Sequence, residues 1–201
     1  MKCSIISGAP NCDVDFLKNN VDKNFFIICA DSGYRHCIDA GITPDIVIGD
    51  FDSSPAPDNI KCIKLPEKKD TFYVVKYAVE NGFDELEIFN AVGNRFDHTY
   101  SNMMCLNYCK DHNIKASIID RQNKLLMVDK KIIINDSVYK YFSLFAIGGE
   151  VSGLTIKNAE YELENVLLSP FDQYTQSNTF KSCDVEISFQ SGNLLLVQSN
   201  D

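Results

Sequence analysis

Two aspartates about a quarter of the way along the chain, Asp50 and Asp52, follow closely after residues 45–48, a short apolar run that predicts a buried strand. In open α/β sheets, ligands bind at the carboxyl ends of the strands. In extended backbone the two side chains would point to the same side, and like charges held together cost energy unless a cation lies between them. Mg²⁺ is the expected cation because it takes carboxylate oxygens together with substrate phosphate oxygens. The simpler alternative is a polar turn in which one Asp caps the next helix.

More polar residues follow other predicted strands, and in a parallel sheet all these positions lie on one edge. They are Asp31, Asp70, Arg95, Asp97 and His98. Each has a simpler explanation alone: the aspartates as helix N-caps, the histidine as a satisfied first-turn residue, the arginine as a surface ion pair. Together they indicate phosphoryl-type transfer. Carboxylates would hold Mg²⁺ on phosphate oxygens, an Arg would bind phosphate, and an Asp would orient or deprotonate an attacking hydroxyl.

Three common nucleotide or hydrolase motifs are absent from the chain. It has no G-x-x-x-x-G-K-[ST] loop, no G-x-G-x-x-G fingerprint and no G-x-S-x-G nucleophile elbow. These absences argue against a P-loop enzyme, a dinucleotide-binding protein with the glycine fingerprint and a serine hydrolase of the nucleophile-elbow type.

The first part of the chain alternates predicted strands with helices. The strands are expected at residues 2–7, 25–30, 45–48, 60–65, 85–89 and 115–119. Helices are expected at 34–40, 70–81 and 97–109, with 13–23 as a polar helix or a loop. This alternation predicts an α/β fold, with a Rossmann-like, mostly parallel sheet and helices on both faces.

After about residue 123 the pattern changes to short strands without a convincing helix. The candidates are residues 125–128, 131–134, 141–146, 151–156, 161–163, 184–189 and 193–197. The last two are separated by Gln190-Ser191-Gly192, which predicts a hairpin turn. We therefore expect two domains, an α/β domain at 1–123 and an all-β domain at 124–201.

Composition narrows the class of protein. The 201 residues are 45% hydrophobic and carry a formal net charge of −9, which argues against nucleic acid as a partner because phosphates require a basic face. No apolar run approaches the length of a membrane span, and the N-terminus does not resemble a secretory signal. The eight cysteines form no C-x-x-C pair, which indicates reduced, mostly buried thiols in a cytoplasmic protein.

Three segments of the first part resemble the thiamine pyrophosphokinases: Asp31-Ser32-Gly33, residues 41–53 (GITPDIVIGDFDS) and residues 93–99 (GNRFDHT). The family patterns are roughly D-G-G, G-I-x-P-D-x-x-I-G-D-F-D-S and G-x-R-x-D-H. In the second part, residues 153–157 and Ser177-Asn178 are similar to segments of that family's β domain. The resemblance runs from about residue 30 to the C-terminus, and its middle motif is long and specific.

The resemblance implies a reaction and an architecture. Such enzymes transfer the pyrophosphoryl group of ATP to the hydroxyl of thiamine, with Mg²⁺, giving thiamine diphosphate and AMP. They are homodimers in which an α/β catalytic domain binds the nucleotide. A β-sandwich domain serves thiamine binding and dimerisation, and thiamine lies in a cleft between subunits.

The resemblance also assigns expected roles to residues of this chain. The catalytic and Mg²⁺-binding residues would be Asp50, Asp52, Asp70 and Asp97. The substrate-binding residues would be Asp31, Asn94, Arg95, His98, Ser177 and Asn178. Asn94 and Arg95 match the phosphate-binding turn of the family, whereas Ser177 and Asn178 match its thiamine-side segment. Either Asp70 or Asp97 could act as the base.

Two departures from the family pattern leave alternatives open. The D-x-T-D motif of the family is matched either by Glu67 and Asp70 or, deleting both carboxylates, by Lys69 and Phe72. The first alignment is preferred because it keeps a carboxylate at the start of the following helix. Thr179 stands where the family usually has Glu. Two alternative functions follow, a related Mg²⁺-dependent transferase acting on another alcohol and a non-catalytic thiamine- or nucleotide-binding protein.

Overall fold

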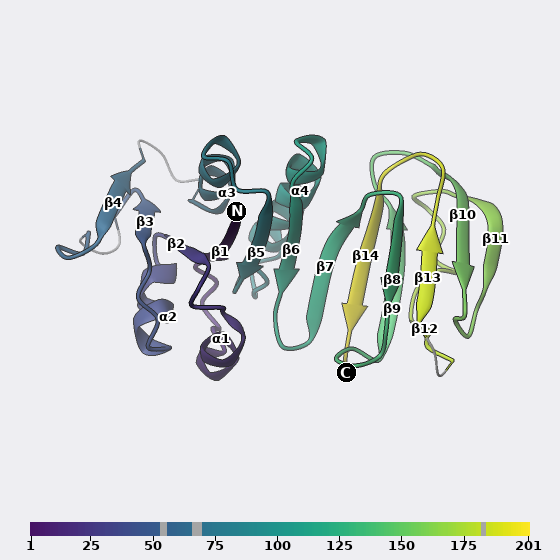
Figure 1. Cartoon of the computed structure of the whole chain (residues 1–201), viewed down its shortest axis with the longest axis horizontal. Coiled ribbons are helices and arrows are strands. Elements are labelled where there is room, and N and C mark those ends of the chain that lie inside the picture. The colour runs from purple at the N-terminus through teal and green to yellow at the C-terminus, as the bar shows by residue number, and fades with distance from the viewer. Residues whose placement is uncertain (53–55, 66–69, 182–183) are drawn as a thin grey trace. The chain divides into compact units, whose positions relative to one another are not determined.

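The chain folds into two compact units, Met1–Arg121 and Gln122–Asp201 (Figure 1). The structure is a computed structural model, and it describes residues 1–52, 56–65, 70–181 and 184–201. The fold is α/β, with a mostly parallel sheet in the first unit and an antiparallel β-sandwich in the second.

Among the described residues, the sheet of the first unit has six parallel strands. They are β1 (Lys2–Ile6), β2 (Phe26–Ala30), β3 (Ile46–Gly49), β4 (Lys61–Lys64), β5 (Glu85–Phe89) and β6 (Lys115–Ile119). Their order is β6-β5-β1-β2-β3-β4, and every neighbouring pair is parallel. The chain runs outward from β1 to β4 and then returns to β5 on the other side of β1. The order of the strands therefore reverses between β1 and β5, where open α/β sheets form a ligand-binding crevice.

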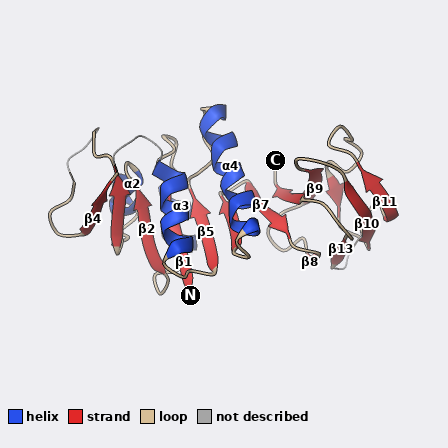
Figure 2. Cartoon of the chain, turned by 90° about the horizontal axis from the view of Figure 1, so that it is seen from above, coloured by secondary structure: helices blue, strands red, loops and turns tan. Residues whose placement is uncertain are grey.

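In the part of this unit that the structure describes, four helices accompany these strands. They are α1 (Val14–Asn20), α2 (Gly33–Asp39), α3 (Asp70–Glu80) and α4 (Phe96–Asp111). Helices α3 and α4 pack against each other and lie side by side in Figure 2. The polar segment 13–23, for which the sequence allowed a helix or a loop, forms α1. Its N-cap Asp13 accepts a hydrogen bond from the backbone N–H of Phe16 at 2.9 Å.

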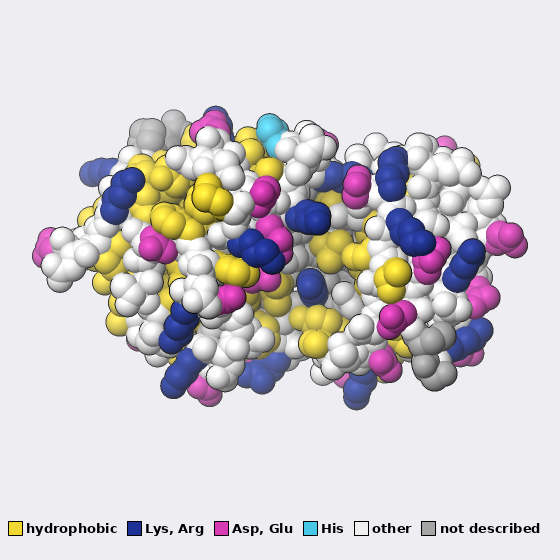
Figure 3. All heavy atoms as spheres, in the orientation of Figure 1, with side chains coloured by type: hydrophobic (Ala, Val, Ile, Leu, Met, Phe, Trp, Pro, Cys, Tyr) yellow, Lys and Arg dark blue, Asp and Glu magenta, His cyan; other side chains and the backbone are white. Residues whose placement is uncertain are grey.

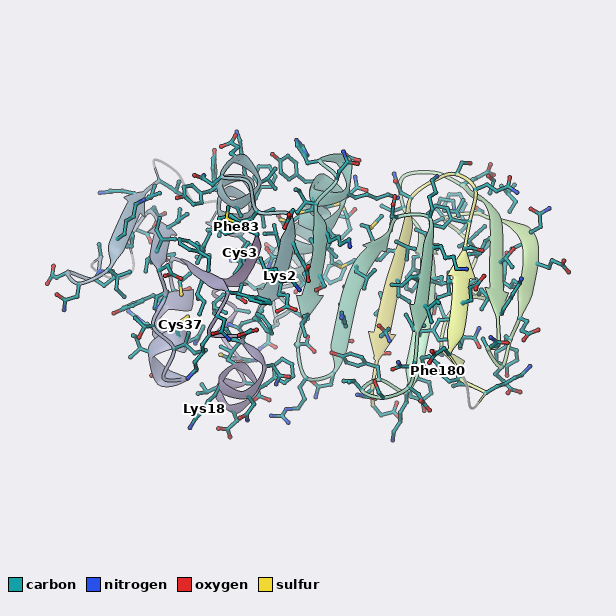
Figure 4. All side chains as sticks on the ribbon, in the orientation of Figure 1. Lys2, Cys3, Lys18, Cys37, Phe83 and Phe180 are labelled. Atoms are coloured by element: carbon teal, nitrogen blue, oxygen red, sulfur yellow. The ribbon has the colours of Figure 1, made fainter. Side chains whose placement is uncertain are left out.

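Alternate residues of the strands pack against helices in the core of the first unit. Ile27 and Cys29 of β2 belong to a buried cluster with Leu17 of α1 and Cys37 of α2. Cys37 points from α2 toward the strands (Figure 4), and its sulfur lies 2.8 Å from that of Cys29. The seven cysteines among the described residues are free thiols. Burial raises the pKa of Cys3 to about 12, so such thiols stay protonated at neutral pH and pack as small apolar side chains.

The second unit consists of two antiparallel sheets. Its strands are β7 (Asn123–Val128), β8 (Lys131–Ile134), β9 (Tyr141–Ala146), β10 (Val151–Lys157), β11 (Leu163–Leu168), β12 (Asn178–Thr179), β13 (Val185–Ser188) and β14 (Leu194–Ser199). The strand orders are β12-β9-β14-β7 and β11-β10-β13-β8. Phe142 and Leu196 from the first sheet share one buried cluster with Leu154 and Ile187 from the second, which is how a sandwich buries its inner faces.

Two strand predictions for this unit are wrong. The segment Gln190-Ser191-Gly192 is not a hairpin turn, because β13 pairs with β10 and β8 whereas β14 pairs with β7 and β9. The segment instead carries the chain from one sheet to the other. The strand expected at 161–163 lies at Leu163–Leu168, where Asn165, with φ 51°, interrupts the regular alternation.

Charged side chains of both signs are interspersed on the face of the molecule shown in Figure 3. On that face, the described residues form no continuous basic surface. Within the described parts of the chain, every helix is too short or too polar to cross a membrane.

Candidate active site

A cavity of about 630 Å³ lies at the carboxyl ends of the strands in the first unit. Its wall is built from the loops after β1, β2, β3 and β5 and from the first turns of α3 and α4. The lining residues are Ser7, Gly8, Ala9, Pro10, Ala30, Ser32, Asp50, Asp52, Thr71, Phe72, Ala91, Gly93, Arg95, Asp97, His98, Thr99, Ser101 and Asn102. The cavity lies at the sheet edge where the order of the strands reverses, as expected of a ligand site in this fold.

Three carboxylates converge at this edge. Asp31 follows β2, and Asp50 and Asp52 follow β3; one oxygen from each lies within 4.8 Å of the others. Asp31 and Asp50 are half-buried, whereas Asp52 is exposed. Asp50 also accepts a hydrogen bond from the backbone N–H of Asp52 at 3.1 Å. Three carboxylates this close repel one another unless a cation is shared between them, and oxygen ligands of this kind suit Mg²⁺.

Left-handed backbone brings these carboxylates together. Phe51, between the two aspartates, has φ 57°, and Asp31 has φ 38°. The expectation that extended backbone aligns Asp50 and Asp52 is therefore wrong, because a turn at Phe51 places them. Gly49 makes room for Asp31: a Cβ on Gly49 would lie 2.7 Å from the Asp31 carboxylate oxygen. Non-glycine residues in this region are strained, and such strain gathers at functional sites.

Arg95 and Asp97 form an ion pair at the cavity wall. The guanidinium contacts both carboxylate oxygens, at 2.5 Å and 3.2 Å, and both side chains are exposed. Hydrogen bonding from Arg95 holds the pKa of Asp97 below its usual value, so the carboxylate is ionised at neutral pH. Among the described residues, the metal-like cluster contains Asp31 and does not include Asp97.

The simpler interpretation of Asp31 and Asp97 as helix N-caps is wrong. The N-cap of α2 is Ser32, and that of α4 is Arg95; neither caps its helix through a side-chain hydrogen bond. Asp31 precedes its helix in left-handed backbone. Asp97 lies inside the first turn of α4, where a negative charge is favoured by the helix dipole.

The first turns of α4 hold the loop that follows β5. Thr99 accepts a hydrogen bond from Gly93 N–H at 3.1 Å and contacts the Gly93 carbonyl at 3.2 Å, and Asn102 donates to the Ala91 carbonyl at 2.7 Å. His98 lines the cavity beside them. Asn94 is exposed and lies between Gly93 and Arg95, both of which line the cavity.

The start of α3 is tied to the end of β1. The hydroxyls of Ser7 and Thr71 lie 2.7 Å apart, and Ser7 is almost fully buried. Asp70 is the first residue of α3, but its side chain lies outside the part of the chain that the structure describes. Glu67, Lys68 and Lys69 also lie outside the described residues, so the two alignments of this motif stay predictions.

Ser177 and Asn178 lie in the second unit, and only the side chain of Ser177 is exposed to solvent. Asn178 is buried, and its amide bonds the backbone of Tyr161 at 3.0 Å and 2.8 Å. Ser177 is exposed, with φ 54°, and its backbone N–H donates to Ser143. Asn178 therefore shapes the loop, whereas the hydroxyl of Ser177 is presented to solvent.

The sequence did not single out the loop from Ser7 to Pro10 or the polar residues Thr71, Thr99 and Asn102 as part of the site. The loop carries no ionisable side chain, and its one available signal was its place after the first strand of a parallel sheet. Thr99 was quoted only as the last residue of a motif. Thr99 and Asn102 bond the backbone of the loop after β5, and Thr71 bonds the hydroxyl of Ser7, and a motif search detects neither kind of contact.

Two family models match the chain. The first, described as "Thiamin pyrophosphokinase, catalytic domain", matches residues 17–118. The second, described as "Thiamin pyrophosphokinase, vitamin B1 binding domain", matches residues 130–194. The first match lies in the unit that contains the carboxylate cluster and the cavity, and the second lies in the β-sandwich.

Similar proteins cover nearly the whole chain. The thiamine pyrophosphokinase of Bacillus subtilis is 27% identical over 210 residues, covering 98% of this chain and 98% of that protein. A crystal structure of the Bacillus subtilis thiamine pyrophosphokinase has a TM-score of 0.90 at 26% identity, covering 100% of both chains. A crystal structure of the thiamin pyrophosphokinase from Geobacillus thermodenitrificans has a TM-score of 0.87 at 26% identity and covers 100% of this chain and 98% of that one.

Proposed function

The chain belongs to the thiamin pyrophosphokinase family, and from this premise we propose that it transfers the pyrophosphoryl group of ATP to the hydroxyl of thiamine, giving thiamine diphosphate and AMP. The observation that carries the proposal is the cluster of Asp31, Asp50 and Asp52 beside a cavity of about 630 Å³ at the carboxyl edge of the sheet. A polyphosphate with its cation is a ligand that such a cluster suits.

The cluster is the proposed Mg²⁺ site. Three convergent carboxylates offer hard oxygen ligands and would repel one another without a cation, so the donor set fits this ion. When bound, Mg²⁺ neutralises charge on the phosphate oxygens of the nucleotide. Asp31, Asp50 and Asp52 would hold it. Asp70, whose side chain the structure does not describe, stays a predicted ligand, and so does Asp97, which lies outside the cluster.

The ion pair between Arg95 and Asp97 is proposed to open when the substrates bind, so that each side chain contacts a different substrate. The guanidinium of Arg95 presents a planar fork that suits phosphate oxygens, and it lies at the cavity wall. As Arg95 engages phosphate, Asp97 would be released to orient the hydroxyl of thiamine or accept its proton. The lowered pKa of Asp97 keeps it ionised and ready to accept a hydrogen bond at neutral pH.

The second unit is proposed to bind thiamine and to form a homodimer, with the thiamine site completed by a second copy of the chain. The matched vitamin B1 binding domain and the exposed Ser177 support this assignment. For the first unit, we infer that helices cover both faces of the sheet. Cys29 packs with α1 and α2, whereas its neighbour Ile28, on the opposite face of the strand, is also fully buried.

Phosphorus NMR of the reaction products tests the proposed reaction. With ATP, thiamine and Mg²⁺, the expected products are AMP and thiamine diphosphate. Formation of ADP and thiamine monophosphate would show phosphoryl transfer instead and contradict the proposal. Omitting thiamine serves as the control, because AMP formed without it would indicate hydrolysis of ATP.

A further inference from the structure

Asn90 lies where the order of the strands reverses and joins the two loops on either side. It directly follows β5, and the residue is only 8% exposed. It is absent from the cavity lining, although both the loop that it begins and the loop after β1 line the cavity. An effect of Asn90 on the reaction would therefore act through the loops and not through the cavity surface.

The amide of Asn90 uses both of its N–H donors on the loop after β1. Nδ2 donates to the Ser7 carbonyl at 3.0 Å and to the Ala9 carbonyl at 2.8 Å. In return, the backbone N–H of Ala9 donates to the Asn90 carbonyl at 3.2 Å. These bonds join residues more than 80 positions apart in the sequence. They fix the backbone of Ser7 and Ala9, which is part of the cavity wall.

The backbone of Asn90 is in the left-handed region, with φ 53°. Glycine is the usual residue for this conformation, and Asn is among the few others that tolerate it. Glycine would satisfy the backbone but would leave the two carbonyls without these donors. The loops also approach closely at Gly93, where a Cβ would lie 3.0 Å from the Cβ of Ala9. The choice of Asn therefore adds a connection between the loops that the turn alone does not require.

We propose that Asn90 is a positioning residue that fixes the loop of Ser7–Ala9 against the loop of Ala91–Gly93 before the nucleotide binds. Resting on the proposed function, this assigns the shape of the polyphosphate end of the cavity to one buried amide. The loop after β1 also reaches α3 through the hydroxyls of Ser7 and Thr71, 2.7 Å apart. Loss of the amide would loosen three parts of the wall together.

Two variants remove the donors in different ways. Asn90→Gly keeps the left-handed backbone without strain, and Asn90→Asp keeps the size of the side chain but turns a carboxylate toward two carbonyls. The matched control is Asn113→Gly. Asn113 also has positive φ, at 59°, but is exposed at the end of α4 and does not line the cavity.

The measurement is calorimetric binding of Mg²⁺ with α,β-methylene-ATP, whose bridging carbon prevents pyrophosphoryl transfer, well below the Tm of each variant. Loss of two hydrogen bonds should raise the Kd at least about 5-fold in both Asn90 variants and leave it within about 2-fold in Asn113→Gly. A merely structural role would lower the Tm and leave the Kd of the folded protein unchanged, which would overturn the inference.

The remaining outcomes also test the proposed role of Asn90. If wild type does not bind the analogue, the proposed function and this inference both fail, whereas wild-type binding with unchanged Asn90 variants overturns the inference alone. If neither variant folds, hydrogen exchange of the Asn90 side-chain amide in ligand-free wild type decides. Slow exchange supports an amide already bonded before binding, and exchange as fast as that of an exposed Asn overturns the proposal.

Discussion

The three carboxylates at the edge of the sheet place like charges close together, and like charges repel one another. Asp31, Asp50 and Asp52 each bring an oxygen within 4.8 Å of the others, and two of them are half-buried, which weakens screening by water. Left-handed backbone at Asp31 and Phe51 adds strain. A metal that binds only the folded protein would offset both costs by mass action.

Asp50→Asn should therefore raise the stability of the metal-free protein and reduce the stability that Mg²⁺ adds. Without Mg²⁺, the variant should melt higher than wild type, by roughly 2–4 °C for each kcal/mol of repulsion relieved, because one of three like charges is removed. Wild type should gain stability as Mg²⁺ is added, whereas the variant should gain little. Thermal melts across a Mg²⁺ titration measure both effects.

Asp39→Asn is the control, because Asp39 is exposed on α2 and lies outside the cluster. This variant should respond to Mg²⁺ as wild type does. If Asp50→Asn and wild type showed the same response, Asp50 would not be a metal ligand.

Asp97 allows a pH measurement at a single residue. The hydrogen bonds from Arg95 hold the pKa of Asp97 below its ordinary value of 3.8. A depressed pKa means that the ion pair is present above that ordinary value and is lost as pH falls through the lowered one. In Arg95→Ala the titration midpoint of Asp97 should rise toward 3.8, because the largest cause of the shift is removed. The carboxyl ¹³C shift of Asp97 follows the titration, and the same midpoint in both proteins would refute the cause assigned to Arg95.

At the scale of elements, helix α1 depends on its cap. Asp13 accepts a hydrogen bond from Phe16 N–H and forms an ion pair with Arg121, and these contacts lower its pKa. Asp13→Ala should cost about 0.5–2 kcal/mol of stability at neutral pH through loss of the cap. The difference from wild type should be complete above the ordinary Asp pKa and should vanish as pH falls through the lowered pKa.

Urea unfolding at several pH values measures this difference. Asp15→Ala, in the first turn of the same helix but not its N-cap, is the matched control and should cost less. A loss of stability in Asp13→Ala that persisted at a pH well below the lowered pKa of Asp13 would point to packing instead of the ionised cap.

Most elements of the first unit follow from the sequence, whereas the turns between them do not. Runs such as residues 45–48 predict buried strands because strands covered by protein are apolar throughout. The turns depend on Asp31, Phe51 and Asn90, which adopt positive φ although glycine is the usual residue there. Local sequence could not show that these residues would turn, since Asp31 and Asn90 are held by hydrogen bonds to residues of other strands and loops.

The residues of the cavity that the sequence predicted are mainly those with ionisable side chains. Asp50, Asp52, Arg95, Asp97 and His98 were expected at one edge, and the cavity brings them together. The wall between them comes from backbone and neutral side chains, which carry no recognisable pattern. The hairpin at 190–192 failed for a related reason: a short polar turn shows where a chain reverses but not whether the next strand joins the same sheet.

At the scale of the whole molecule, two family models match the two units. One chain therefore contains a matched catalytic domain and a matched vitamin B1 binding domain, as the proposed reaction requires. The first unit carries the carboxylates and the cavity, and the second has the core of an independent sandwich. The net charge of −9 is compatible with a substrate whose thiazolium ring is cationic.

The proposed homodimer predicts a mass in solution of twice that of one chain. Sedimentation equilibrium should show the dimer at micromolar concentrations, without dependence on Mg²⁺ or nucleotide, because the proposed interface belongs to the second unit and the metal site to the first. A monomer with full activity would contradict the proposal that a second copy completes the thiamine site.

The central claim is that the carboxylate cluster supports thiamine-dependent cleavage of ATP to AMP, and AMP release in Mg²⁺ with and without thiamine tests it most directly. Wild type should release AMP only when thiamine is present. Asp52→Asn should lower that rate by at least about 100-fold while remaining folded, since groups that merely orient metal ligands are already worth about 10–100-fold. Full activity in Asp52→Asn, or AMP release that does not depend on thiamine, would contradict the account.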